Sequence, residues 1–129
     1  MVEYKFLPYK LVHKFEKLAE YYGISKAARG VEQPKTTDKG FVRVYEKAKT
    51  PEKLEKIPVR KANPSGANWR QTRNNRVAAK LGQMKKMGIS MYGKDGLPTK
   101  MHTILIMWAY SPDERKLDKM DLKVLDEKR

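Results

Sequence analysis

Hydrophobic residues in the first third of the chain follow a helical spacing and then a strand-like one. Between Leu11 and Tyr22 they recur every three or four positions, which predicts an amphipathic helix over residues 9–22. Gly23 follows directly and suits the left-handed conformation in which many helices end. Residues 41–47 alternate apolar and polar side chains, as a half-buried strand does, so we expect a strand there.

A second helical pattern covers residues 68–87. Val77 and Met84 share one apolar stripe of this segment, and Gly88 follows it as a stop. Gly82 lies inside the predicted helix, where glycine is less stable than alanine by about 1 kcal/mol. Its presence suggests close packing at that position.

Capping residues predict two further helices. Thr50 can cap a short helix, because a proline follows it at the first helical position. Ser111, a following proline and Glu114 form a capping signature of the same kind. They predict a C-terminal helix over residues 112–127.

Two apolar runs, residues 89–92 and 101–110, flank the octapeptide GKDGLPTK. Its glycines and proline are turn residues, so the natural interpretation is a β-hairpin. The second run is the most apolar segment of the chain, and we expect it to form the central strand.

Together these elements predict the fold class α+β, as a single small domain in which a mostly antiparallel sheet is covered by about three helices. The expected sheet is built from residues 41–47, 56–61, 89–92 and 101–110, and the expected helices are residues 9–22, 68–87 and 112–127.

Composition excludes several classes of site. The chain has 129 residues, 40% of them hydrophobic, with no cysteine and two histidines. Disulfides, Fe–S clusters and thiolate zinc sites are therefore excluded, and we expect neither a cofactor nor a metal. The longest apolar run is about half of the ~20 residues that a membrane-spanning helix needs, and the first residues lack the pattern of a signal peptide. We expect a cytoplasmic protein that does not bind membranes.

The charge is strongly positive and unevenly distributed. Lys and Arg number 29 against 15 Asp and Glu, which gives a formal charge of +14. Residues 111–129 are neutral, with six basic and six acidic side chains. We therefore divide the chain into a basic part, residues 1–110, and a neutral C-terminal helix that packs on the domain or on a partner. Residues 56–94 contain ten basic and no acidic residues, a pattern typical of contact with phosphates.

The helix predicted over residues 68–87 lies within this acid-free segment. Arg70 and Arg73 share a stripe with Val77, yet an unpaired guanidinium is very costly to bury. Either this end of the helix projects and meets phosphates, or its arginines pair with carboxylates such as Glu46, Glu52 or Glu55. Asparagine and glutamine can read adenine edges, and Trp69 can stack on a base or anchor the core.

The segment FEKLAEYYGISKAARG resembles the first helix and turn of the helix-turn-helix motif. The resemblance covers about sixteen residues and departs at Arg29, where an aliphatic residue is expected. It implies that Ser25 and Lys26, at the start of a second helix, contact DNA, with Arg29 nearby. The alternative is an ordinary helix with a glycine stop.

Two other function classes stay open. A small nuclease or RNase toxin would need a general base such as His102, although a histidine in an apolar strand is more often structural. An interaction module for an acidic protein partner would use the neutral C-terminal helix, which could also form a homodimer.

The favoured hypothesis is a non-enzymatic nucleic-acid-binding protein, with DNA favoured over RNA, that neutralises phosphates through the basic helix at residues 68–87. The candidate binding residues are Lys26, Arg29, Lys39, Arg43, Arg60, Lys61, Asn68, Trp69, Arg70, Gln71, Arg73, Asn74, Arg76, Lys80, Lys85 and Lys86. No catalytic residue is predicted.

Overall fold

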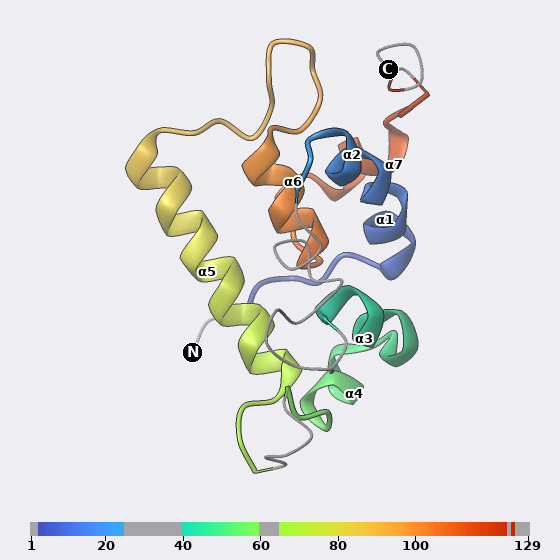
Figure 1. Ribbon diagram of the computed structural model, residues 1–129, viewed down its shortest axis with the longest axis vertical. Coiled ribbons are helices and arrows are strands. Elements are labelled where there is room, and N and C mark those ends of the chain that lie inside the picture. Colours follow the sequence, from blue (N-terminus) through green and yellow to red (C-terminus); the bar gives the residue numbers. More distant parts are fainter. Residues whose placement is uncertain (1–2, 25–39, 60–64, 124, 126–129) are drawn as a thin grey trace.

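Helices are the regular elements of the described chain. The computed structural model describes residues 3–24, 40–59, 65–123 and 125. Within these ranges the elements are α1 (Tyr9–Lys14), α2 (Glu16–Tyr21), α3 (Phe41–Ala48), α4 (Pro51–Glu55), α5 (Trp69–Met87), α6 (Lys100–Met107) and α7 (Glu114–Lys119) (Figure 1).

The prediction of an α+β domain with a mostly antiparallel sheet is wrong. The described residues form no sheet, and their strand-like pairing consists of two isolated antiparallel bridges, Pro58 with Asn68 and Tyr92 with Pro98. The second bridge closes the turn of the expected hairpin, but helix α6 follows that turn in place of a strand. Of the other expected strands, residues 41–47 are in α3, and residues 60 and 61 lie outside the described ranges.

Helix α3 arises from a sequence that fits two periods. In FVRVYEKA the buried residues are Phe41, Val42, Tyr45 and Ala48, which lie on one face of a helix. The same letters also alternate partly between apolar and polar residues, and this suggested a strand. Packing of the helical face on the core decides between the two.

Helix α6 is the buried centre of the fold. Residues 102–109 are all buried, and α1, α2 and α5 pack around the helix. A short apolar run cannot be assigned to a buried strand or a buried helix by periodicity alone. Thr99 favours the helix, because its hydroxyl oxygen accepts the backbone N–H of His102 and caps the first turn.

Local end signals are confirmed at three helices. Gly88 ends α5 at φ +67°, and Gly23, which follows α2, has φ +68°. The start of α5 has a reciprocal capping box between Asn68 and Gln71, which was not predicted. Thr50 caps α4 by accepting the backbone N–H of Lys53. The helix expected over residues 9–22 is present as α1 and α2, interrupted at Phe15.

The C-terminal helix is shorter than predicted. Helix α7 begins at Glu114 and ends at Lys119, so Asp113 and not Ser111 holds the N-cap position. The Ser111 hydroxyl lies 2.8 Å from His102 Nε2, and its oxygen accepts the backbone N–H of Asp113 at 3.2 Å. Leu117, within this helix, and Leu122 and Leu125, which follow it, are buried in the core. The segment therefore packs on its own chain.

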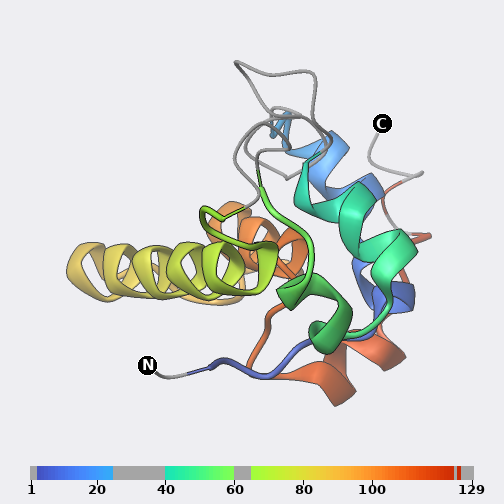
Figure 2. The same cartoon turned by 90° about the horizontal axis from the view of Figure 1, so that it is seen from below.

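Helix α5 packs against α4 and α6 over part of its length only. Its later turns extend past the body of the molecule, whereas its first turns lie beside α4 and the segment that begins at Glu3 (Figures 1 and 2). Across the described residues, no helix is both long enough and apolar enough to span a membrane.

Candidate nucleic-acid interface

The predicted binding residues fall into groups with different surroundings. Five of them lie outside the described residues, together with Ser25 and the second helix of the helix-turn-helix resemblance; the five are Lys26, Arg29, Lys39, Arg60 and Lys61. The others lie on α3, in the first turns of α5, and in its later turns.

Arg73 is inside the protein and not on its surface. Its side chain is fully buried, and the Phe6 ring lies 3.7 Å from its guanidinium carbon. A guanidinium has five N–H donors, and all five are used here. The acceptors are the backbone carbonyls of Tyr4, Lys5 (2.9 Å), Trp108 (3.0 Å) and Ala109 (2.9 Å) and the side-chain oxygen of Asn74 (2.8 Å).

The C-terminal end of α6 explains why this buried charge is tolerated. The carbonyls of Trp108 and Ala109 follow the last turn of α6, where the helix dipole is negative and carbonyls lack intrahelical partners. Burial lowers the pKa of Arg73 to about 10, so the group still carries its charge at neutral pH. Arg73 therefore has no N–H left for a phosphate.

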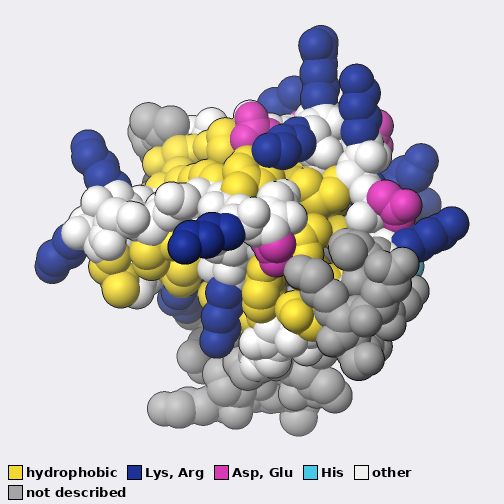
Figure 3. Space-filling view, turned by 90° about the horizontal axis from the view of Figure 1, so that it is seen from above, with side chains coloured by type: hydrophobic (Ala, Val, Ile, Leu, Met, Phe, Trp, Pro, Cys, Tyr) yellow, Lys and Arg dark blue, Asp and Glu magenta, His cyan; other side chains and the backbone are white. Residues whose placement is uncertain are grey.

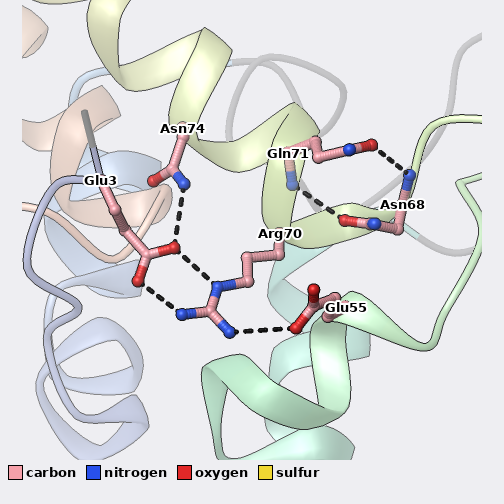
Figure 4. A pocket seen from close by; sticks show the side chains of 6 residues that line it. All are labelled: Glu3, Glu55, Asn68, Arg70, Gln71 and Asn74. Carbon is pink, nitrogen blue, oxygen red and sulfur yellow. Dashed lines mark hydrogen bonds and ion pairs between the residues drawn. The ribbon is translucent and has the colours of Figure 1, made fainter. Parts of the chain in front are cut away.

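Arg70 lies in an ion-pair cluster at the first turns of α5 (Figure 4). Its Nε and Nη2 donate to the two carboxylate oxygens of Glu3 at 2.6 and 2.8 Å, and its Nη1 donates to Glu55 at 3.3 Å. The hydrogen bond from Arg70 holds the pKa of Glu3 below its ordinary value, and the same bond raises the pKa of Arg70. With Asn68, Gln71 and Asn74 these side chains line a shallow hollow of about 200 Å³.

The polar and aromatic residues beside Arg70 have structural roles. Asn68 and Gln71 cap α5 reciprocally, and Asn74 is buried and donates to Glu3 at 3.2 Å. Trp69 is 3% exposed and packs near the rings of Phe41 and Trp108. The alternative interpretation, arginine–carboxylate pairing with a core tryptophan, therefore describes this end of the helix.

Arg43 is engaged in a second polar cluster, on α3. Its guanidinium contacts Glu16 at 2.9 Å and Glu46 at 3.4 Å, and the Tyr9 hydroxyl donates to Glu46 at 2.8 Å. Burial, followed by the hydrogen bond to Glu46, raises the pKa of Tyr9 to about 12. Two carboxylates thus neutralise Arg43 locally.

The cations on the later turns of α5, unlike Arg43 and Arg70, have no carboxylate partner among the described residues. Arg76, Lys85 and Lys86 are exposed and Lys80 is half-buried, and none of the four lies within ion-pair distance of a carboxylate in the described ranges. We call these four residues the α5 cationic surface. The helix has no acidic residue of its own.

The surroundings of the α5 cationic surface are open. Ala78, Ala79 and Gly82 are exposed between its charged residues, and a Cβ atom at Gly82 would meet nothing within 4 Å. The close packing expected at Gly82 is therefore absent among the described residues. Figure 3 shows Lys and Arg side chains standing out from the molecule, with few Asp and Glu side chains on that face.

His102 is a satisfied core residue. Its side chain is fully buried, with Nδ1 2.8 Å from the Met91 carbonyl and Nε2 2.8 Å from the Ser111 hydroxyl. A carbonyl can only accept, so Nδ1 carries the proton and Nε2 accepts from Ser111. Burial lowers the pKa of His102 and keeps it neutral. The histidine stands on a helix and not on the expected strand, and it offers no exposed base.

Glu3 is the residue of the Arg70 cluster that sequence reasoning missed. It is separated from Arg70 by 67 positions, and no local pattern marks the pair.

Metal binding gains no support, because the described residues contain no group of three His, Asp or Glu side chains placed to hold an ion. No family model, curated protein or solved structure matches the chain.

Proposed function

We propose that the protein binds nucleic acid without cleaving it, through the α5 cationic surface. The observation that carries this proposal is the set of four cations on α5 with no neighbouring carboxylate among the described residues. Cations that already sit in ion pairs must lose a partner before they bind phosphate, whereas these four need only lose water. Phosphate contact then releases condensed counterions, which is the main source of affinity for duplex DNA.

DNA is favoured over RNA because the cations belong to an exposed helix. The major groove of DNA admits an α-helix, whereas the major groove of A-form RNA is deep and narrow. The later turns of α5 extend beyond the other helices (Figure 2), so a duplex can approach them without meeting the body of the protein. Small side chains between the charges allow that approach to be close.

The rival functions gain less support. A nuclease that uses His102 would need this residue to reach a substrate, and its side chain has no exposed surface. Capture of an acidic protein, dimerisation through the C-terminal segment and a cytoplasmic location stay predictions.

The test compares two variants with equal loss of charge. The first replaces Arg76, Lys80, Lys85 and Lys86 with alanine. The control replaces Lys10, Lys47, Lys119 and Lys123, four exposed lysines on other helices or near the C-terminus. Binding to labelled duplex DNA, single-stranded DNA and duplex RNA is measured by fluorescence anisotropy across a salt series, and gels after incubation with Mg²⁺ report cleavage.

We expect wild-type protein to bind duplex DNA most tightly and to leave it intact. The α5 variant should lose affinity at every salt concentration, and its slope of log K against log salt should fall by about 0.9 for each phosphate contact removed. The control variant should keep the wild-type slope. Absence of wild-type binding at about 50 mM salt, or an equal loss in both variants, would overturn the proposal.

A further inference from the structure

Glu3 holds Arg70 in the geometry in which a guanidinium binds a phosphate. Two parallel hydrogen bonds join the guanidinium to the two carboxylate oxygens, at 2.6 and 2.8 Å, and the Asn74 amide donates to one of the same oxygens at 3.2 Å. Arginine recognises carboxylate and phosphate through the same paired N–H groups. The Arg70 guanidinium and the Asn74 amide, which donate to Glu3, could therefore donate in the same way to two oxygens of a phosphate (Figure 4).

The segment that carries Glu3 is anchored next to it. Arg73 donates to the backbone carbonyls of Tyr4 and Lys5, the two residues that follow Glu3. This anchor uses backbone atoms and does not involve the Glu3 carboxylate. The carboxylate can therefore leave Arg70 while the segment stays attached to α5.

The ion pair itself is open to exchange with solvent. The Glu3 and Glu55 side chains are 39% and 63% exposed, whereas Arg70 is 26% exposed. Exposed ion pairs contribute little to the stability of a protein. A phosphate that is already held nearby by other cations can replace such a carboxylate.

The Arg70 site lies on the same helix as the α5 cationic surface and near one of its edges. Lys85 comes eleven residues after Asn74, and a rotation of about 100° per residue places the two positions within about 20° of one line along the helix. Their separation along the axis is about 16 Å. A polyanion that follows this edge from Lys85 would reach Asn74 and Arg70.

We infer that Arg70 and Asn74 form a phosphate subsite that extends the α5 cationic surface, and that Glu3 occupies this subsite until a phosphate of the bound nucleic acid displaces its carboxylate. The inference rests on the proposed function. Glu3 then acts as a built-in competitor that weakens binding to nucleic acid, and its removal strengthens binding.

The test is the substitution Glu3→Gln, with Asp118→Asn as its matched control. Both raise the net charge by one, but the Asp118 side chain is exposed on α7 and forms no hydrogen bond or ion pair with α5 among the described residues. Affinity for labelled duplex DNA is measured by anisotropy over a salt series, and thermal unfolding checks that both variants fold. A double variant, Glu3→Gln with Arg70→Gln, removes the subsite.

We expect Glu3→Gln to bind about fivefold or more tightly than Asp118→Asn, with a salt slope steeper by about 0.9, the value for one added phosphate contact on duplex DNA. The double variant should lose this gain. If Glu3→Gln matches Asp118→Asn while wild-type protein still binds through the α5 cationic surface, the subsite is refuted and the proposed function stands. A further variant combines Glu3→Gln with the alanine substitutions of Arg76, Lys80, Lys85 and Lys86. If it binds duplex DNA as tightly as Glu3→Gln alone, the subsite is supported and the proposed surface is refuted. If no variant binds, both are refuted.

Discussion

Arg73 and His102 are buried ionisable side chains whose nitrogens are all hydrogen-bonded. Most of their acceptors are backbone carbonyls, which every residue possesses and which leave no mark in a sequence. Position on a helical stripe was the available clue, because Arg73 shares its stripe with Val77. This position implied that Arg73 would need hydrogen-bond partners if it were buried, but it did not show which residues they are. For His102 the prediction of a structural role followed from its apolar neighbours, although the type of element was wrong.

His102 makes the stability of the protein depend on pH. Because burial lowers its folded-state pKa below the unfolded value of 6.5, the unfolded chain takes up a proton first as the pH falls. The free energy of unfolding should therefore fall between pH 7.5 and 5.5, by up to about 1.4 kcal/mol from this residue. Urea unfolding at both pH values measures the change.

The variant His102→Asn keeps an amide donor near the Met91 carbonyl but cannot titrate. Its free energy of unfolding should change less over the same range, whatever its absolute stability. The carboxyl of Glu3, whose pKa is also lowered, acts only below about 4.5 and does not interfere. An equal pH dependence in both proteins would contradict the assignment.

At the scale of elements, helix ends were predicted better than helix types. The start of α4 depends on Thr50 and the end of α5 on Gly88, and the contacts of both reach only three or four residues along the chain. The type of α3 and α6 depends on which faces the rest of the fold covers. The eight residues of each helix contain no information about which of their faces the rest of the fold covers, so both segments were predicted as strands.

Gly82 and Gly88 should respond in opposite ways to alanine. Gly82 lies inside α5 with open space around its Cβ position, so Gly82→Ala should raise the free energy of unfolding by up to about 1 kcal/mol. Gly88 also has open space but adopts φ +67°, so Gly88→Ala should lower it by about 1 kcal/mol. Chemical unfolding of both variants measures the difference, and a loss of stability in Gly82→Ala would indicate that an unseen contact needs the glycine.

Over the whole molecule, charge patterning located the candidate surface but not its limits. The acid-free segment led to α5, yet carboxylates from outside that segment, Glu3 and Glu55, neutralise Arg70. Arg73 joins three parts of the chain that are far apart in sequence: residues 4 and 5, α5, and the end of α6. Such long-range partners depend on the complete fold and cannot be inferred from spacing.

Arg73→Met should therefore destabilise the entire fold. The substitution leaves the backbone carbonyls of Tyr4, Lys5 and Trp108 and the Asn74 oxygen without the donor that Arg73 supplies, whereas the Ala109 carbonyl keeps the Leu7 amide. We expect a loss of at least about 3 kcal/mol in the free energy of unfolding. Arg73→Lys should not restore stability, because an ammonium group has three donors and no planar fork. Arg76→Met, at an exposed position of the same helix, is the control and should change stability by about 0.5 kcal/mol or less. A loss below about 1 kcal/mol for Arg73→Met would contradict the role given to this residue.

The attachment of the N-terminal segment also bears on the order of folding during synthesis. The Leu7 amide donates to the Ala109 carbonyl at 2.7 Å, and Tyr4 and Lys5 depend on Arg73. This segment therefore finds its partners in α5 and at the end of α6, which follow it far later in the chain. At roughly 5–20 residues per second, about 100 residues take some 5–20 s to synthesise. During that time the segment cannot bind the end of α6, and the ion pair between Glu3 and Arg70 reaches its final geometry only after α6 has folded.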